Sequence, residues 1–184
     1  MIRRTIIFII CSISLLSVKA QDFHVVTGKT VIIDGVTSFG RFACDYQQSN
    51  EKDTLLFDAK YVRDSPLMDI YLPVNGFGCG NKMLNRDFNK TLQSDDYPFI
   101  HVLVEQFFQE ENAYFSSLRL KLVGKELYME KLPFILVEEN GIQLLKAEFE
   151  LNLSYFDLEP PKKFLGLLKV KEELNVRLEL SLEQ

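Results

Sequence analysis

Two segments near the carboxyl end of the sequence alternate apolar and polar residues with a period of two. In residues 174–182 every even position is apolar and every odd position is polar, and residues 145–155 carry apolar side chains at every odd position. Successive side chains of a β-strand point to opposite faces, so residues 174–182 and 143–155 are predicted strands with one apolar face. A consistently polar opposite face excludes a parallel sheet buried on both sides, which leaves an antiparallel sandwich or a closed barrel.

Weaker alternation continues through the rest of the chain. It predicts further strands at 24–33, 36–46, 54–62, 68–74, 99–108, 114–122 and 126–137. Residues typical of turns separate them, at Asp34-Gly35, Ser49-Asn50, Ser65-Pro66, Gly124-Lys125 and Glu139-Asn140-Gly141. The expected fold class is all-β.

Residues 81–95 break the alternation and predict one short helix. Leu84, Phe88 and Leu92 are spaced by four, which places them on one stripe of a helix. Asn81 is suited to the N-cap position, and Pro98 ends any helical conformation before it. We expect the apolar stripe to lie on the sheet.

The first twenty residues have the three parts of an export signal. Arg3 and Arg4 precede an apolar run from Thr5 to Leu16, and small residues lead to Ala20. We expect cleavage before Gln21, a periplasmic or secreted location, and one domain over residues 21–184. The apolar run is shorter than the roughly 20 residues that span a bilayer, so the expected product is not an integral membrane protein.

Charge argues against nucleic acid as a partner. Residues 1–20 hold three basic and no acidic residues, so residues 21–184 hold 18 basic against 26 acidic ones, a formal charge of −8. Such a surface repels phosphate backbones and anionic headgroups. The sequence carries no prediction of oligomeric state.

Cys44 and Cys79 are the two cysteines that remain after the expected cleavage. Export brings them into an oxidising compartment, where an even pair is expected to be bridged. Two buried thiols that pack as small hydrophobic side chains are the alternative.

The sequence displays no arrangement typical of catalysis or of metal binding. It holds two histidines, no Gly-x-Ser-x-Gly motif and no Cys-x-x-Cys pair, and Gly76, Gly78 and Gly80 lack the spacing of a dinucleotide-binding loop. We therefore expect no enzyme activity, no metal and no cofactor. An active site would need His101 beside Cys79, or beside a carboxylate inside a cleft.

Three stretches resemble the YceI-like family of exported lipid-binding proteins. They are Cys79–Leu92 with the following Asp96-Tyr-Pro-Phe-Ile100, the segment Gly35–Cys44, and Leu165–Lys171. The resemblance implies a lipocalin-like, antiparallel up-and-down β-barrel of about eight strands, with the helix near the barrel. It also implies an apolar lumen that holds a polyisoprenoid, a quinone or a similar amphiphile.

The positions of apolar residues in these stretches and strands predict the lumen lining. The predicted lining residues are Phe42, Leu84, Phe88, Leu92, Phe149, Leu151 and Leu178. Residues 118–134 fit the family pattern poorly and the loop at 159–163 is short, so we expect a small lumen. A barrel with a filled core, which acts as a structural or protein-interaction module in the cell envelope, is the alternative function.

Overall fold

A computed structural model of the protein describes residues 23–56, 66–111, 113–160 and 170–183. The expected export signal at 1–20 lies outside these residues, as do Ser65 and residues 57–62 of the strand expected at 54–62. Their predictions stay predictions. None of the described helices is long and apolar enough to cross a membrane.

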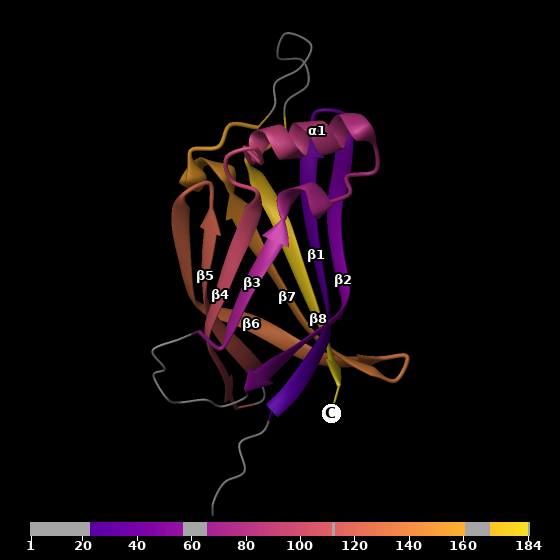
Figure 1. Ribbon diagram of the computed structural model, residues 1–184, viewed down its shortest axis with the longest axis vertical. Coiled ribbons are helices and arrows are strands. Elements are labelled where there is room, and N and C mark those ends of the chain that lie inside the picture. Colours follow the sequence, from indigo (N-terminus) through magenta and orange to yellow (C-terminus); the bar gives the residue numbers. More distant parts are fainter. Residues whose placement is uncertain (1–22, 57–65, 112, 161–169, 184) are drawn as a thin grey trace, which may run out of the picture.

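Eight antiparallel strands and one α-helix make up most of the described chain (Figure 1). The strands are β1 (Phe23–Thr37), β2 (Gly40–Leu56), β3 (Met68–Pro73), β4 (Phe99–Glu110), β5 (Ala113–Leu122), β6 (Lys125–Glu139), β7 (Ile142–Asn152) and β8 (Glu173–Glu183). The helix is α1 (Lys82–Thr91), and two short 3-10 helices are η1 (Val74–Gly76) and η2 (Leu153–Phe156). The expected all-β class with one short helix is confirmed.

The strands form one curled sheet in the order β2-β1-β8-β7-β6-β5-β4-β3. Because β1 pairs with β8, the sheet closes on itself except between β2 and β3, which are consecutive in the chain. This open junction is called the seam below. Across the seam, Asp45 and Gly78 exchange two backbone hydrogen bonds with N–O distances of 3.0 and 2.8 Å. The fold is therefore an up-and-down barrel with one open seam.

The Cys44–Cys79 disulfide also spans the seam, next to the Asp45–Gly78 bridge. Both cysteines are buried. The predicted pairing is confirmed, and its place in the fold shows that the covalent bond joins β2 to the segment that leads into α1.

Helix α1 lies across one end of the barrel (Figure 1). The Asn81 side chain accepts hydrogen bonds from the backbone N–H groups of Met83 and Leu84 at 3.0 and 2.9 Å, as expected of an N-cap. The helix ends at Thr91 rather than at residue 95, and Gln93 has a left-handed backbone with φ of 50°. A short helix followed by a tight turn brings the chain directly into β4.

Two expected turns are wrong. Asp34 and Gly35 lie inside β1, and Ser49 and Asn50 lie inside β2 at a register shift against β1. The strand expected at 36–46 consequently contains the real turn, at Ser38 and Phe39. Pairing with two neighbouring strands outweighs the local turn preference of Asp34-Gly35.

The strand expected at 143–155 is three residues too long. Residues 153–155 belong to η2, because the Asn152 side chain accepts a hydrogen bond from the Ser154 N–H at 2.9 Å and starts a helical turn. Leu153 is buried and Tyr155 is 52% exposed. Leu153 and Tyr155 are both apolar, but in the 3-10 helix one points into the core and the other toward solvent, whereas in a strand they would share a face.

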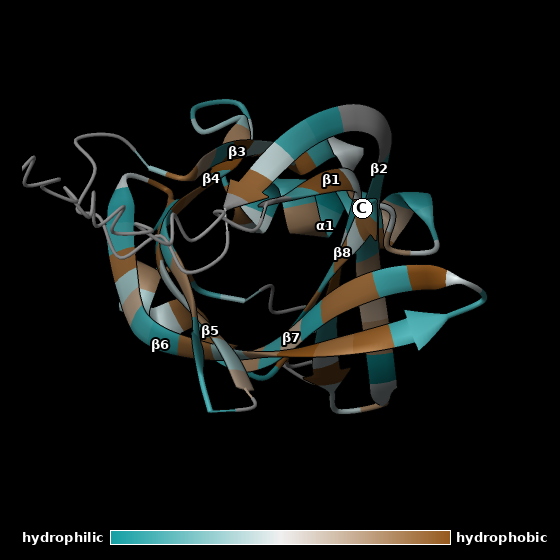
Figure 2. Cartoon of the chain, turned by 90° about the horizontal axis from the view of Figure 1, so that it is seen from below, coloured by the Kyte–Doolittle hydropathy of each residue, from teal (hydrophilic) through white to brown (hydrophobic). Residues whose placement is uncertain are grey.

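Apolar side chains fill the inside of the curled sheet. Along β5 and β8 the buried positions alternate, with Leu118, Leu120 and Leu122 on the first strand and Leu174 and Val176 on the second. Figure 2, a view along the barrel, shows hydrophobic and hydrophilic residues alternating along β6 and β7 as both curve round the interior. The apolar residues of the period-two pattern thus form the barrel interior.

Candidate functional site

The interior of the barrel contains an apolar cavity of about 70 Å³, called the inner cavity below. Every residue that lines it is apolar, and strands β1, β3, β4, β5, β6, β7 and β8 all contribute. Representative lining residues are Val31, Leu72, Val102, Leu120, Met129 and Val176. A space of this chemistry offers no hydrogen bond to a polar group and favours a hydrocarbon.

A second cavity, of about 80 Å³, lies between α1 and the end of the barrel and is called the mouth cavity. Most of its lining is apolar, but Thr37, Asp87 and Thr91 add two hydroxyl groups and a carboxylate. Cys44 also lines it, so the disulfide holds the seam closed beside the mouth.

The two cavities adjoin. They share five lining residues, which are Ile33, Phe88, Leu92, Leu153 and Leu174. Phe88 comes from α1 and its ring lies 5.2 Å from that of Phe77, centroid to centroid. The side chains of α1 therefore stand at the boundary between the mouth and the inner cavity.

The structure places the seven predicted lining residues around these cavities. Phe42 and Leu84 line the mouth cavity, Phe88 and Leu92 line both, and Phe149, Leu151 and Leu178 line the inner cavity. Contact of any of them with a ligand stays a prediction.

Several lining residues were not selected from the sequence. Leu153 and Leu174 are apolar positions of the alternating segments, but no feature distinguished them from other core positions. Asp87 and Thr91 follow Leu84 and Phe88 by three residues, which puts them on the border of the same helical stripe. That spacing could have predicted that these two polar side chains line the mouth cavity.

Both cavities are small. A ligand pocket usually measures about 300–1,000 Å³, whereas these measure about 70 and 80 Å³. The narrow interior agrees with the small lumen expected from residues 118–134 and 159–163.

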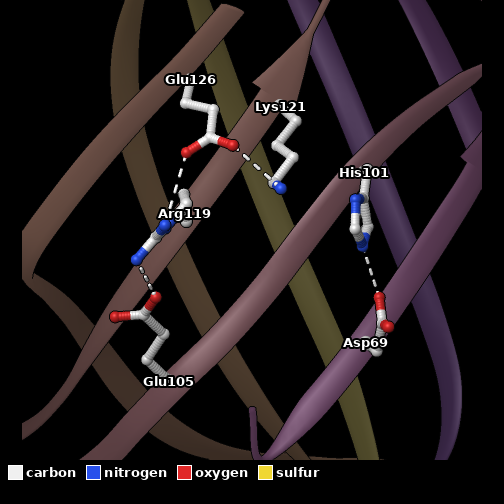
Figure 3. Close-up of polar contacts among 6 residues, drawn as sticks. All are labelled: Asp69, His101, Glu105, Arg119, Lys121 and Glu126. Atoms are coloured by element: carbon white, nitrogen blue, oxygen red, sulfur yellow. Dashed lines mark hydrogen bonds and ion pairs between the residues drawn. The ribbon is translucent and has the colours of Figure 1, made fainter. Parts of the chain in front are cut away.

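His101 lies outside the barrel interior, on the outer face of β4 (Figure 3). Its imidazole contacts the Asp69 carboxylate and stacks on the ring of Tyr71, with centroids 4.2 Å apart. The pair that an active site would need thus exists, but neither residue lines the mouth or the inner cavity. Among the described residues no group of three or more His, Cys, Asp or Glu side chains is arranged to hold a metal ion.

A network of charged side chains covers the neighbouring outer face of β4, β5 and β6 (Figure 3). Lys121 Nζ lies 2.9 Å and Arg119 Nη1 3.4 Å from the Glu126 carboxylate, and Arg119 Nη2 lies 2.5 Å from Glu105. The hydrogen bond from Lys121 is the main cause of a lowered pKa of Glu126, and the charge of Glu105 is the main cause of a raised pKa of Arg119. Both pKa shifts arise from ion pairs on the solvent-exposed outer face of the sheet.

The fold and the cavities together define a class: an up-and-down β-barrel with a narrow apolar interior, capped at one end by an amphipathic helix. No protein-family model matches the sequence, and no curated protein matches it. Two solved structures share its fold. One is BcnA of Burkholderia cenocepacia, with 14% sequence identity, a TM-score of 0.55, and coverage of 83% of this chain and 95% of that chain.

The other is a polyisoprenoid-binding domain from Saccharophagus degradans, implicated in plant cell wall breakdown. It shares 10% sequence identity with a TM-score of 0.62, and the match covers 89% of this chain and 99% of that domain. The fold implied by the resemblance to the YceI-like family is thereby confirmed.

Proposed function

We propose that this protein is an exported, non-catalytic lipid-binding protein that holds a polyisoprenoid, a quinone or a similar amphiphile in its barrel. The observation that carries the proposal is the pair of adjoining apolar cavities, one under α1 at the mouth and the other in the barrel interior. The shared fold with a polyisoprenoid-binding domain supports the same class of ligand. Burial of apolar surface, at about 25 cal/mol per Å², would supply the binding free energy.

Uptake of a chain requires the two cavities to join. Phe88 of α1 and Leu92, which follows the last residue of α1, line both cavities. A change in their side-chain conformations, or a small movement of α1, is the step that would open a continuous lumen. The three polar lining groups at the mouth would then face the polar end of the ligand, while its hydrocarbon part enters the inner cavity.

Export is the part of the proposal that rests on the sequence of residues 1–20. It would place an apolar-lined barrel in an aqueous compartment next to membranes. A carrier in that position lets a water-insoluble lipid leave one membrane without exposure to water.

The experiment combines lipid extraction with two substitutions at one position. The purified protein is extracted with organic solvent and analysed by mass spectrometry, and binding of an added fluorescent isoprenoid is titrated. Phe88→Ala should retain or increase binding because it joins the cavities, and Phe88→Trp should reduce it at least tenfold because the larger ring fills their boundary. Tyr128→Ala, on the outer face of β6 and 52% exposed, is the matched control and should leave binding unchanged.

Two results would overturn the proposal. One is a protein that yields no lipid on extraction and, both as wild type and as Phe88→Ala, takes up no added isoprenoid. The other is equal binding by the Phe88→Ala and Phe88→Trp variants, which would locate any binding outside the two cavities.

A barrel with a filled core that acts as an interaction module is the second candidate. The small cavity volumes favour it. So does the hairpin of β6 and β7, where Ile135 is 62% and Ile142 is 50% exposed, because exposed apolar side chains on a strand are typical of contact surfaces. This candidate predicts no isoprenoid uptake by either Phe88 variant.

A further inference from the structure

Helix α1 presents a row of basic side chains away from the barrel. Lys82, Arg86 and Lys90 recur every four residues, on the side opposite the apolar row that contains Leu84 and Phe88. All three basic residues are exposed, and they line an open surface groove. The ion pairs found among the described residues include none of them. Their charges are thus available to a partner.

Exposed apolar side chains occur at the same end of the barrel. Phe39 is 78% exposed in the turn between β1 and β2, and Met83 is 51% exposed on the first turn of α1. Tyr97 and Phe99, which follow α1, are 39% and 49% exposed. Figure 1 shows the β1–β2 turn, α1 and the start of β4 together at one end of the molecule. Aromatic and aliphatic groups beside cations are typical of surfaces that lie in the membrane interface.

A membrane would meet the charge of the residues near α1 rather than the acidic balance of the whole chain. Strands of ten or more residues are on the order of 30 Å long at about 3.3 Å per residue, and the Debye length at physiological ionic strength is about 8 Å. Acidic groups at the far end of the barrel are therefore screened from a surface that touches α1. Asp95 and Asp96 are exposed just after the helix and line the same groove, whereas Asp87 of α1 is half-buried and lines the mouth cavity. The groove thus holds three basic residues against two acidic ones.

We propose that the α1 end of the barrel docks on an anionic lipid surface. Lys82, Arg86 and Lys90 contact the headgroups, and Phe39 and Met83 enter the interface between headgroups and acyl chains. Docking in this orientation turns the mouth cavity, which lies under α1, toward the membrane. The inference goes beyond lipid binding in the lumen, because adsorption to a surface requires no occupied cavity.

The test measures partition of the purified protein onto vesicles. Vesicles of phosphatidylcholine with phosphatidylglycerol should bind the protein and vesicles of phosphatidylcholine alone should bind it weakly, with binding to the anionic vesicles falling as salt is raised. Each basic residue at such a surface contributes about fivefold, so the triple variant K82Q/R86Q/K90Q should lose on the order of 100-fold in partition. F39S should lose about tenfold through its apolar contact.

Two further variants make the test specific to this face. K52Q/K131Q/K146Q changes the net charge by the same amount, and its lysines pair with Glu183, Glu110 and Glu139 away from α1. This control should partition like the wild type. D95N/D96N removes the acidic residues of the groove and should strengthen partition.

Equal loss of partition by K82Q/R86Q/K90Q and by K52Q/K131Q/K146Q would overturn the proposal, as would equal binding to neutral and anionic vesicles. Isoprenoid binding in solution is measured on the same samples. A K82Q/R86Q/K90Q variant that binds isoprenoid but not vesicles supports docking. A wild-type protein that binds no isoprenoid would contradict the proposed lumen function, and the vesicle measurements would still decide the docking proposal.

Discussion

The disulfide between Cys44 and Cys79 allows a quantitative prediction, because its effect depends on the length of chain that it closes. The two cysteines are 35 residues apart in sequence. In the chain-entropy account, closing a loop of this length lowers the entropy of the unfolded chain enough to stabilise the folded state by about 4 kcal/mol. The double substitution Cys44→Ala and Cys79→Ala should therefore lower the free energy of unfolding by about that amount.

The native structure gives a reason why few other contacts compensate for the loss. At the seam, the described residues of β2 and of the segment before α1 share one isolated bridge, between Asp45 and Gly78. Without the disulfide, this bridge and the packing of the Tyr46 ring on that of Phe77, 5.4 Å apart between centroids, are what hold the two edges together. The seam beside the mouth cavity should then open before the rest of the barrel unfolds.

Equilibrium unfolding in urea, followed by circular dichroism, measures the effect. With a denaturant slope of about 2 kcal/mol per M, the midpoint should fall by about 2 M. Wild-type protein that is unfolded and refolded in dithiothreitol is the chemical control and should match the double variant. Hydrogen exchange should show lost protection at Asp45 and Gly78 before it is lost along β7 and β8.

A loss below about 1 kcal/mol would refute this reasoning, since it would show that the unfolded chain already holds the two segments close together. A large loss shared evenly by all strands in hydrogen exchange would refute the separate statement that the seam opens first.

Three further predictions concern single positions. Asn81→Ala removes the side chain that caps α1 and should cost about 1 kcal/mol of stability, measured by urea unfolding; no loss would contradict the capping role. The lowered pKa of Glu126 contributes stability above its ordinary value of 4.5, and this is lost as the pH falls through the lowered value; Lys121→Gln should move the pKa back up, which a side-chain NMR titration detects, and an unchanged titration would contradict the assignment to Lys121. Gly35→Ala should displace the ring of Phe42, which overlaps the position of the new methyl group, and cost about 1–3 kcal/mol; a crystal structure with an unmoved ring would contradict the packing described here.

The elements that the sequence predicts well are those in which burial and local pattern agree. β4, β5, β7 and β8 each pack one face on the interior, and their bounds differ from the predicted ones by a few residues even though register shifts interrupt the alternation in β4 and β5. The N-cap at Asn81 was predictable for a similar reason, since a helix start depends on hydrogen bonds within a few residues.

The elements predicted wrongly are those in which tertiary contacts outweigh local preference. Asp34-Gly35 has the composition of a turn, yet Gly35 pairs with Phe42 and sits beneath its ring. Local residues carry no signal for such cross-strand packing, so the turn was expected four residues before the real one at Ser38-Phe39.

Charge, too, is predicted by the sequence in one respect and decided by the tertiary structure in another. Composition by itself determines that residues 21–184 are acidic, and predicts that they repel anionic surfaces. The position of α1 across one end of the barrel decides that Lys82, Arg86 and Lys90 all face away from the apolar interior. Net charge is a sum over residues, whereas attraction to a surface depends on which residues lie within a Debye length of it.

The sequence by itself determined which faces of the strands are apolar, that one short helix interrupts them, and that Cys44 and Cys79 can pair. Only the tertiary structure decided that β1 closes on β8, that the seam falls between β2 and β3, and that Phe88 lies between two small cavities together with four other shared lining residues. The physical reason is that alternation and helical spacing are properties of neighbouring residues. Closure, the seam and cavity volume arise from contacts between segments far apart in the chain.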